Sequence, residues 1–426
     1  MAFVKKPVTG MRDILPEEMA VRTYLMQLIS DVYKTYGFNR IETPVVEHIE
    51  NLLSKQGGDN EKLIFKVMKR GDKLARETQA VAEGNFDALC DSGLRYDLTL
   101  PLSRYYANNQ SSLPQPFKAL QMGPVFRADR PQRGRFRQFV QCDIDILGDP
   151  TSLAEKELIL ATTEALDRLG FDKYNYRIVI NDRRILHELI QYAGLPEEDA
   201  ENILIILDKA DKIGAEGVDR ELEEAGYSAA SIEKLRKLLD ACEKDAESVR
   251  KLGDAIGTEG AKEACQSVAD IMESVTAVDG RTIRIEFMPT LVRGMGYYTG
   301  TIFEIQVDSF GSSVGGGGRY DKMVGKFTGQ DVPAVGFSIG FERIMTLLME
   351  QGFQVPGKNE RTAYLIEKGM PSARLGQIFA KANEARKDGQ EVLVVWMAKN
   401  KKFQKENLSK QGYTAFCEFY REELKR

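Results

Sequence analysis

The chain has 426 residues, more than the roughly 250–300 that one hydrophobic core usually serves, so we expect more than one domain. Hydrophobic residues make up 42% of the chain and charged residues 29%, which is ordinary for a soluble globular protein. The formal net charge is only −5, which excludes a global basic field of the kind that attracts nucleic acids.

Cysteines, histidines and apolar segments exclude three further classes of protein. The five cysteines are odd in number, widely spaced and free of a C-x-x-C pair, so they do not indicate a disulfide framework. The two histidines, His48 and His187, lie far apart, and we assign no residue to a metal site. The N-terminus lacks the apolar region of a signal peptide, and no apolar run approaches the ~18 residues of a membrane span. We therefore expect a cytoplasmic protein with no membrane partner.

The N-terminal residues predict a helix followed by a strand. Five apolar residues recur at helical spacing on one face: Leu25, Leu28, Ile29, Val32 and Tyr33. Gly37 closes this helix, as glycine often does just past a helix C-terminus. Residues 40–47 predict a strand, and Pro44 inside it favours an edge or interface position, because proline cannot donate a hydrogen bond to a sheet.

Residues 94–148 predict further strands. Residues 94–107 predict a strand that turns into a helix after Pro101. Residues 117–148 predict two strands around a polar loop, residues 128–134, that is rich in Arg, Pro and Gly.

Residues 185–277 differ in character from the segments around them. Strand patterns vanish there, and abundant Glu, Asp, Lys and Ala accompany helical apolar patterns, which predicts a helical insertion. Strand patterns return at Ile283, and residues 334–339 predict a strand that leads into a helix. Residues 356–358 indicate a linker, after which the tail alternates three strands with two helices.

These patterns predict a division of the chain into four parts. Residues 1–184 and 278–352 form the core, residues 185–277 the insertion, residues 353–360 a linker and residues 361–426 a small C-terminal domain. This last domain holds 14 Lys and Arg against 8 Asp and Glu, a balance of +6 in a chain whose net charge is −5. A basic domain on an acidic body is a hint of contact with a polyanion.

Arginines are concentrated in the predicted hairpin of residues 117–148. Arg127 ends the first strand, and four more arginines follow within eleven residues: Arg130, Arg133, Arg135 and Arg137. So many like charges are unfavourable in a purely structural hairpin, whereas guanidinium groups offer forked donors to phosphate oxygens. We therefore predict that the hairpin binds phosphates or RNA, although a lone arginine at such a place is usually a surface ion-pair residue.

Two glycine-rich segments are candidate ligand surfaces. Arg343 starts a predicted helix after Gly336 and Gly340, and small residues let a ligand approach the backbone closely. Taken alone, Arg343 fits an exposed ion pair with Glu342 better. Residues 315–318 are four consecutive glycines that match neither a G-x-x-x-x-G-K-[ST] loop nor a G-x-G-x-x-G fingerprint. They favour the floor under a flat ligand, or a β-bulge, over a phosphate loop.

Carboxylates alternate with apolar residues on two predicted strands. Asp97 and Thr99 share one face of the first strand, because side chains alternate along a strand. Gln141, Asp143 and Asp145 share one face of the second in the same way. Two such strands form a natural cage for an ammonium group, while a solvated sheet face is the plainer alternative.

Taken together, the motifs resemble those of the histidyl-tRNA synthetases, a family of class II aminoacyl-tRNA synthetases, over nearly the whole chain. GMRDILP resembles the family's N-terminus, GFNRIETPVVE the first class II motif, and LRYDLTLPLSRY the histidine-binding strand. VFRADRPQRGRFRQFVQCDIDILG resembles the second motif with its tRNA-acceptor loop, and AVGFSIGFERI the third. LVRGMGYYTGTIFE and GGGGRYDKMV resemble the two signatures peculiar to the histidine enzymes, which make the identification specific.

The resemblance implies a set of arginines that bind ATP: Arg127, Arg135, Arg293 and Arg343. Arg127 and Arg293 would be the catalytic residues, reaching the α-phosphate from opposite sides, with Arg127 also near the histidine carboxylate. Arg343 would hold the γ-phosphate. Attack of a carboxylate on a phosphate needs positioning and charge neutralisation rather than a general acid or base, so arginines and Mg²⁺ suffice.

The resemblance implies a second set that binds histidine: Asp97, Thr99, Arg127, Gln141, Asp145, Arg293, Tyr297 and Tyr298. The first two and Gln141 would hold the amino group, and Asp145 and Tyr298 would read the two ring nitrogens. Arg130 and Gln132, in the loop of the second motif, would approach the tRNA acceptor stem. From its residues alone, the Tyr297–Tyr298 pair fits a core position equally well.

The implied function is ATP-dependent activation of L-histidine to histidyl-adenylate and transfer of histidine to the 3′ end of tRNA-His. The implied fold is α+β: an antiparallel class II sheet flanked by helices, a helical insertion, and a C-terminal α/β domain that is a shortened relative of the anticodon-binding domain. ATP and Mg²⁺ would serve the reaction, and the chain would form a homodimer.

Two features depart from the family's pattern. Gly296 stands in RGMGYY where many members have Asp, so we expect a tuned site. Only REELKR follows Tyr420, so anticodon reading is less firmly implied than catalysis.

The alternatives are a regulatory subunit of ATP phosphoribosyltransferase, which shares the fold, and a paralogue that senses histidine or RNA without acylation. The retained Arg127, Arg293 and Arg343 favour the enzyme.

Overall fold

The computed structural model describes residues 3–53, 60–77, 81, 84, 86–293, 297–311, 313–357 and 360–422. By its internal contacts the chain divides into two compact units. The larger unit comprises Met1–Asp13 and Leu25–Gln351, and the smaller unit comprises Ile14–Tyr24 and Gly352–Arg426.

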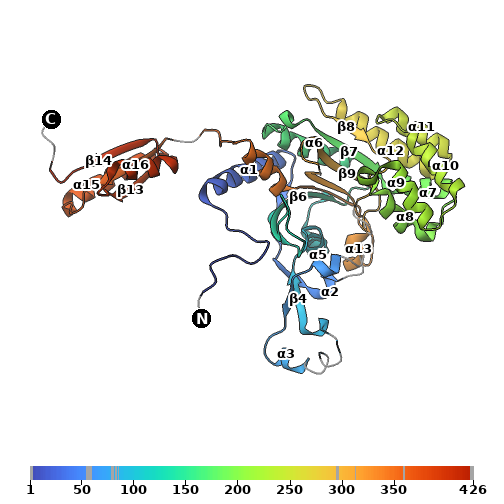
Figure 1. Ribbon diagram of the computed structural model, residues 1–426, viewed down its shortest axis with the longest axis horizontal. Coiled ribbons are helices and arrows are strands. Elements are labelled where there is room, and N and C mark those ends of the chain that lie inside the picture. Colours follow the sequence, from blue (N-terminus) through green and yellow to red (C-terminus); the bar gives the residue numbers. More distant parts are fainter. Residues whose placement is uncertain are drawn as a thin grey trace. The chain divides into compact units, whose positions relative to one another are not determined.

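The larger unit is built on an eight-stranded sheet that is flanked by helices (Figure 1). The strand order is β1-β5-β6-β11-β10-β9-β7-β8. The outermost pairs, β1–β5 and β7–β8, are parallel, and all pairs between them are antiparallel. The bounds are β1 Asn39–Arg40, β5 Phe117–Phe126, β6 Gln138–Leu147, β7 Tyr176–Asp182, β8 Ile285–Phe287, β9 Thr301–Val307, β10 Gly315–Arg319 and β11 Ala334–Ile339. The predicted α+β class with a largely antiparallel sheet is confirmed.

Helix α1 (Pro16–Thr35) has the buried face that its apolar spacing predicts. Leu25, Ile29 and Tyr33 are fully buried, and Gly37 follows the helix with a φ of 82°, which costs glycine little. Four further helices cover the sheet or cap its strands: α5 Thr99–Asn109, α6 Leu153–Arg168, α13 Lys322–Thr328 and α14 Phe341–Glu350.

Residues 183–276 form a group of helices between β7 and β8, as their pattern predicts (Figure 1). The helices are α7 Arg183–Ala193, α8 Ala200–Leu207, α9 Ala210–Glu224, α10 Ala229–Asp240, α11 Ala246–Ile256 and α12 Glu259–Thr276. Asp182, the last residue of β7, accepts a hydrogen bond from the backbone N–H of Arg184 (2.8 Å) and so caps α7. The first helix of the group therefore begins where a strand of the central sheet ends.

A small antiparallel sheet in the order β2-β4-β3 completes the larger unit. Its strands are β2 Val46–His48, β3 Lys66–Met68 and β4 Cys90–Leu94, and the short helices α2 Ile49–Leu52 and α3 Asp72–Arg76 accompany them. The single strand predicted for residues 40–47 is wrong, because β1 and β2 belong to different sheets. Pro44 lies in the irregular segment between them, where its missing N–H breaks no ladder.

The strand predicted to carry Asp97 and Thr99 is also wrong. Strand β4 ends at Leu94, Asp97 lies in the following turn, and Thr99 is the first residue of α5. Pro101 does not delay the helix, since the N–H that proline lacks would have no partner in the first helical turn anyway. An Asp97 carboxylate oxygen accepts a hydrogen bond from the backbone N–H of Leu100 (3.1 Å).

The smaller unit contains a three-stranded parallel sheet with one helix on each face (Figure 1). Strand β12 (Arg361–Ile366) lies between β13 (Glu391–Trp396) and β14 (Ala415–Phe419). Tyr364 and Ile366 pack with residues of α15 (Ser372–Lys387), whereas Ala363 and Leu365 pack with Leu408 of α16 (Lys401–Lys410). This alternation is the one expected of a buried central strand. Among the described residues of the whole chain, no helix combines the length and apolar character needed to cross a membrane.

Gly317 tests the packing of the central strands. A Cβ at this position would lie 1.9 Å from the backbone oxygen of Gly336 on β11, so Gly317→Ala must force the two strands apart. We expect a loss of roughly 1–3 kcal/mol or more in the free energy of unfolding, measured by urea denaturation. Gly376→Ala in α15 is the matched control, because a Cβ there meets nothing within 4 Å and alanine favours a helix. An unchanged urea midpoint for Gly317→Ala would contradict the β10–β11 pairing.

Candidate active site

A cavity of about 490 Å³ lies over the central strands of the large sheet. It is bordered by the turn before α5, the β5–β6 hairpin, Arg293, Tyr297 and Tyr298, β10, β11 and the start of α14. Every residue that the sequence predicts to bind histidine or ATP lines it: Asp97, Thr99, Arg127, Arg135, Gln141, Asp145, Arg293, Tyr297, Tyr298 and Arg343. Arg130 and Gln132 do not line it and are exposed in the hairpin loop. Gly296 lies outside the described residues.

Arg127 is held flat against two aromatic rings. Its guanidinium carbon lies 4.1 Å from the ring centre of Tyr96 and 5.2 Å from that of Phe139. Its Nε donates a hydrogen bond to the backbone oxygen of Tyr96 (3.1 Å). Stacking fixes the plane of the guanidinium and leaves its terminal nitrogens to face a ligand, which is how a forked donor is preorganised for an oxyanion.

Arg293 and Arg343 bring two more cations into the same cavity. Arg293 lies 3.3 Å from Glu304 through its Nε, close enough for an ion pair, yet this buried nitrogen makes no hydrogen bond. Arg343 donates to the backbone oxygen of Ser313. Burial, together with the nearby charges of Arg135 and Arg293, lowers the pKa of Arg343 to about 10. A bound anion would relieve this repulsion.

Strand β6 presents carboxylates to the cavity at alternate positions. Asp145 accepts a hydrogen bond from the hydroxyl of Tyr320 (2.6 Å) through one oxygen, while its other oxygen is buried without a partner. Gln141 donates to Asp143 (3.3 Å) and Ser338 (3.3 Å), and its own side-chain oxygen is also buried without a partner. Two orphaned acceptors in one cavity indicate a ligand that carries N–H donors.

Burial raises the pKa of three of the carboxyl groups that line the cavity. The pKa of Asp145 rises to about 7, because desolvation outweighs the hydrogen bond from Tyr320. The pKa of Asp143 is raised well above its usual range by burial and by the charge of Asp145, and burial also raises that of Asp97. A cationic group bound among them would stabilise their charged forms.

The glycine run at residues 315–318 is strand β10 and forms part of the cavity wall. Its register with β11 is uninterrupted, so the β-bulge alternative is wrong. A Cβ at Gly316 would lie 2.6 Å from the Nε of Arg293, and one at Gly336 would lie 2.0 Å from a carboxylate oxygen of Asp145. These glycines therefore provide the space that the charged side chains occupy.

Tyr297 and Tyr298 contact both the cavity and the apolar cluster beneath it. Both line the cavity, and both pack against buried residues of the neighbouring core. The hydroxyl of Tyr297 donates to that of Tyr298 (3.0 Å), and their ring centres lie 4.3 Å apart. The two tyrosines are therefore both core residues, through their rings, and residues of the cavity wall.

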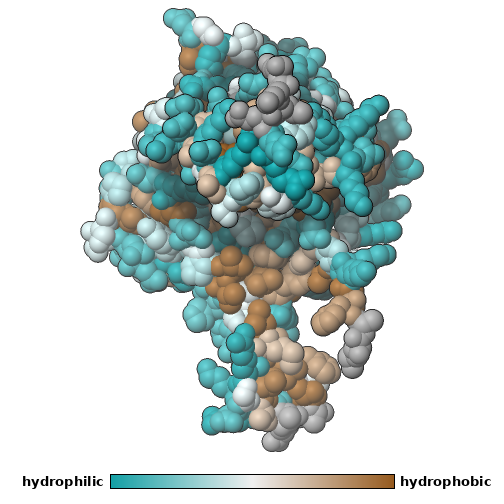
Figure 2. Space-filling model, turned by 90° about the vertical axis from the view of Figure 1, so that its left-hand side faces the viewer, coloured by the Kyte–Doolittle hydropathy of each residue, from teal (hydrophilic) through white to brown (hydrophobic). Residues whose placement is uncertain are grey.

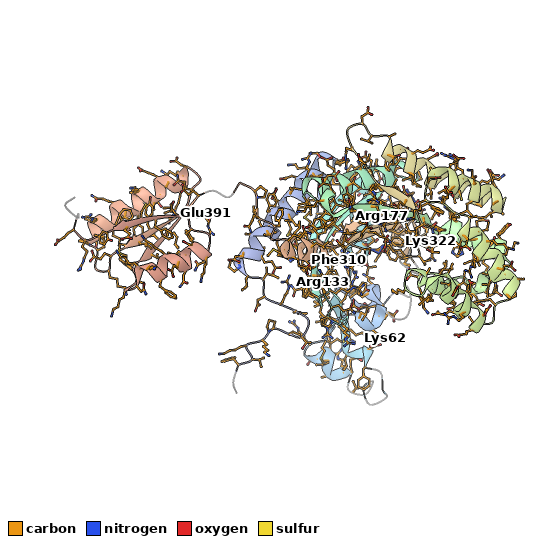
Figure 3. The ribbon with its side chains drawn as sticks, turned by 45° about the horizontal axis from the view of Figure 1, so that its top comes forward. Lys62, Arg133, Arg177, Phe310, Lys322 and Glu391 are labelled. Carbon is orange, nitrogen blue, oxygen red and sulfur yellow. The ribbon has the colours of Figure 1, made fainter. Side chains whose placement is uncertain are left out.

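The hairpin arginines divide into two groups. Arg133 pairs with Glu350 and its guanidinium lies 5.4 Å from the ring centre of Phe310 (Figure 3), and Arg137 donates to the backbone oxygen of Asp129 (3.1 Å). These two have structural partners, whereas Arg127 and Arg135 line the cavity. Of the five hairpin arginines, only Arg127 and Arg135 therefore lie where a ligand in the cavity could contact them.

The cavity residues to which the sequence assigns no role include Tyr96, Asp143, Tyr320 and Ser338. Asp143 shares a strand face with Gln141 and Asp145, but this alternation alone does not mark it as a site residue. The others reach the cavity through long-range pairing of β6 with β11 and through the turn before α5, which no local pattern reveals. Among the described residues, no group of three or more His, Cys, Asp or Glu is arranged to hold a metal ion.

Comparison with known proteins identifies one family. The sequence model of the histidyl-tRNA synthetases matches residues 10–81 and 89–344. A histidine–tRNA ligase of Leifsonia xyli subsp. xyli is 42% identical over 98% of this chain and 96% of its own length, so the C-terminal unit has a counterpart there. A histidine–tRNA ligase of Porphyromonas gingivalis is 38% identical over 80% of this chain and 76% of its own length.

Solved structures show the same fold. The histidyl-tRNA synthetase of Nostoc sp. PCC 7120 superposes with a TM-score of 0.79 at 26% identity, covering 96% of this chain and 90% of that one. A Bacillus halodurans protein described as an ATP phosphoribosyltransferase regulatory subunit/histidyl-tRNA synthetase superposes with a TM-score of 0.78, covering 99% of both chains. At 22% identity this second likeness is evidence for the fold alone.

Asp145→Asn tests the electrostatics of the cavity. The folded-state pKa of Asp145 is about 7 and lies above the ordinary value of 3.8, so the folded protein binds more protons between these values, and stability falls as pH rises through them. The neutral variant escapes this loss. We expect it to be more stable than the unaltered protein above pH ~7, by up to roughly 4 kcal/mol, and to lose this advantage near pH ~4.

Thermal midpoints measured across this pH range give the comparison. Asp279→Asn, a substitution of an exposed carboxyl group, is the control for a general effect of charge. An advantage of Asp145→Asn that does not depend on pH would rule out the buried carboxylate as its source.

Proposed function

The chain belongs to the histidyl-tRNA synthetase family, and we propose that it is a histidine–tRNA ligase. It activates L-histidine with ATP to histidyl-adenylate and transfers histidine to the 3′ end of tRNA-His. The observation that carries this proposal beyond family membership is the cavity lined both by converging arginines and by buried carboxylates with orphaned acceptors. Such a cavity suits a polyphosphate together with a small cation.

In the activation step, a carboxylate oxygen of histidine attacks the α-phosphorus of ATP. The bond between the α-phosphorus and the bridging oxygen breaks, and pyrophosphate leaves. Arg127 and Arg293 are the proposed catalytic residues, because their charges offset the negative charge that grows on the α-phosphoryl oxygens. Arg343 and Arg135 hold the remaining phosphates. The packing of Arg127 against aromatic rings supports this role, since a cation that is already oriented costs little free energy to align with the phosphate.

Histidine is recognised through its two nitrogen-bearing groups. Asp97, Thr99 and Gln141 take the amino group. Asp145 and Tyr298 take the ring nitrogens, and the unpartnered oxygen of Asp145 supports this assignment because it needs an N–H donor. A substrate without ring nitrogens would leave these groups unpaired, which is a strong basis for discrimination. We add Asp143 to the residues that surround the amino group, because Gln141 links it to the same cluster.

Mg²⁺ belongs to the proposed reaction as a partner of the ATP phosphates. Glu342 lines the cavity beside Arg343, and its carboxylate is the hard oxygen donor that this ion prefers. The ion would supply additional neutralisation of phosphoryl charge.

The transfer step uses the hairpin loop. A ribose hydroxyl at the 3′ end of the tRNA attacks the carbonyl carbon of the adenylate, and AMP leaves. Arg130 and Gln132 are exposed at the loop and are proposed to contact the acceptor stem. The tight turn that follows supports a defined loop shape, because Gln132 and Arg135 exchange backbone hydrogen bonds of 3.1 and 2.9 Å.

We propose that residues 1–184 and 278–352 form the catalytic core and residues 185–277 an insertion. Residues 361–426, which follow the linker 353–360, form an anticodon-binding-like domain.

We further propose a cytoplasmic homodimer. Figure 2 shows hydrophobic side chains gathered where the small sheet β2–β4–β3 lies, and Val46, Met68 and Phe86 of this region are 48%, 54% and 65% exposed. An exposed apolar surface of this kind supports self-association, which sedimentation velocity measures directly. The regulatory-subunit alternative has no observation in its favour.

Histidine-dependent exchange of pyrophosphate into ATP tests the activation step, and charging of tRNA-His tests the whole function. We expect Arg293→Lys to slow exchange about 100-fold, because lysine keeps the charge but loses the forked donor. Arg177→Lys is the matched control, since Arg177 lies on β7 outside the cavity (Figure 3) and pairs with Glu286 and Asp308. Histidine binding without any exchange by the unaltered protein would overturn the proposed function.

The loop is tested by Arg130→Ala combined with Gln132→Ala. Both side chains are exposed, so the fold should persist. We expect the KM for tRNA-His in charging to rise about tenfold while exchange without tRNA stays within about twofold, in line with the loss of one or two phosphate or base contacts. Arg284→Ala removes an exposed arginine elsewhere and serves as control. Equal KM values in the loop variant and the control would remove the loop from tRNA recognition.

A further inference from the structure

A second cavity, of about 340 Å³, adjoins the catalytic one. Tyr297 and Tyr298 line both cavities, so this hydrogen-bonded pair forms a shared wall. Apart from Thr299, the remaining lining comes from the first turns of α7, from α8 and from α13, that is, from the helical group on one side and the core on the other. Apart from the histidine-binding role of the shared tyrosines, none of the roles proposed above involves a residue of this cavity.

The second cavity is lined by an excess of basic side chains. Arg183 and His187 lie one turn apart on α7, and Lys322 and Lys326 lie one turn apart on α13, so each pair occupies one helix face. Figure 3 shows Lys322 at the side of the core that meets the helical group. Glu201 is the one carboxylate among the described residues that line this cavity.

Arg183 has more donors than partners. It is only 4% exposed, its Nη2 pairs with Glu201, and its Nη1 is buried with no hydrogen-bond partner. An unpaired buried donor costs about 1–3 kcal/mol unless an acceptor is supplied. Burial and the charge of Arg183 also lower the pKa of His187, which shows that a further cation is disfavoured here.

Lys322 and Lys326 can also bind an anion. Both are exposed, and within the described residues neither makes an ion pair with a carboxylate. A buried guanidinium with a free N–H and two mobile ammonium groups around one cavity match the oxygens of a phosphate group, which accepts from several directions at once.

We propose that the cavity between α7 and α13 binds a phosphate group, contributed by the 3′-terminal nucleotides of the tRNA. This rests on the proposed function, because the hydroxyl that accepts histidine must reach the adenylate, and the nearest phosphodiester groups then lie within a nucleotide or two of the catalytic cavity. Free pyrophosphate has the same chemistry and is the other source of such a group. The cavity lies beyond the tyrosine wall from the arginines that bind ATP, which favours the RNA.

Lys322→Gln combined with Lys326→Gln tests the site, because Arg183 is buried and its replacement endangers folding. The dissociation constant of uncharged tRNA-His is measured by filter binding over a range of NaCl concentrations, and that of inorganic pyrophosphate by calorimetry. We expect about tenfold weaker tRNA binding and a salt dependence, as the slope of log K against log[salt], flatter by about 0.7, since one single-strand phosphate contact contributes about 0.7. Lys212→Gln with Lys262→Gln removes two exposed lysines that line neither cavity and is the control.

Each outcome decides a separate point. Weaker tRNA binding with unchanged pyrophosphate binding assigns the cavity to RNA, and the reverse assigns it to free pyrophosphate. Unchanged affinity for both ligands, at every salt concentration, overturns the proposal. Because these are binding measurements, they remain informative if exchange is absent, so failure of the proposed function is distinguishable from failure of this site.

Discussion

The glycines at particular positions of two neighbouring strands are the constraint on which the catalytic cavity depends. Gly316 on β10 and Gly336 on β11 lie where any Cβ would collide with Arg293 or Asp145. Because the two strands pair without interruption, the sheet itself supplies a flat, rigid surface onto which charged side chains from other elements can settle. A β-sheet with ordinary residues there would fill the same volume with apolar side chains and leave no site.

This geometry obliges the protein to bury charges of both signs that pair with one another only in part. The arginines repel each other, the carboxylates are desolvated, and several acceptors and donors have no partner. Such an arrangement is costly in the absence of ligand, and it is stable only because the surrounding sheet and helices are well packed. The same unsatisfied groups are the ones that a zwitterion and a polyphosphate would satisfy, so the cost is recovered on binding.

Local patterns in the sequence were sufficient for the elements and for most of the cavity. The β5–β6 hairpin and the helices of residues 183–276 follow from periodicity over ten or more residues, and the arginine positions follow from family motifs. The sequence pattern places the start of α5 wrongly, because Pro101 is the third residue of the helix and does not mark its beginning. Tyr320 and Ser338 were missed because they reach Asp145 and Gln141 only through pairing between distant strands. The basic cavity was equally invisible, since α7 and α13 are separated by more than a hundred residues.

The tyrosine pair between the two cavities has a thermodynamic consequence. If an occupant of one cavity alters the position or the hydrogen bond of Tyr297 and Tyr298, it alters the affinity of the other cavity, and linkage requires the effect to be the same in both directions. A nucleic acid that tightened the hold on the amino acid would itself be held more tightly once the amino acid was present. Two adjacent hydroxyl groups would then suffice to make occupation of the two cavities cooperative, with no movement of whole domains.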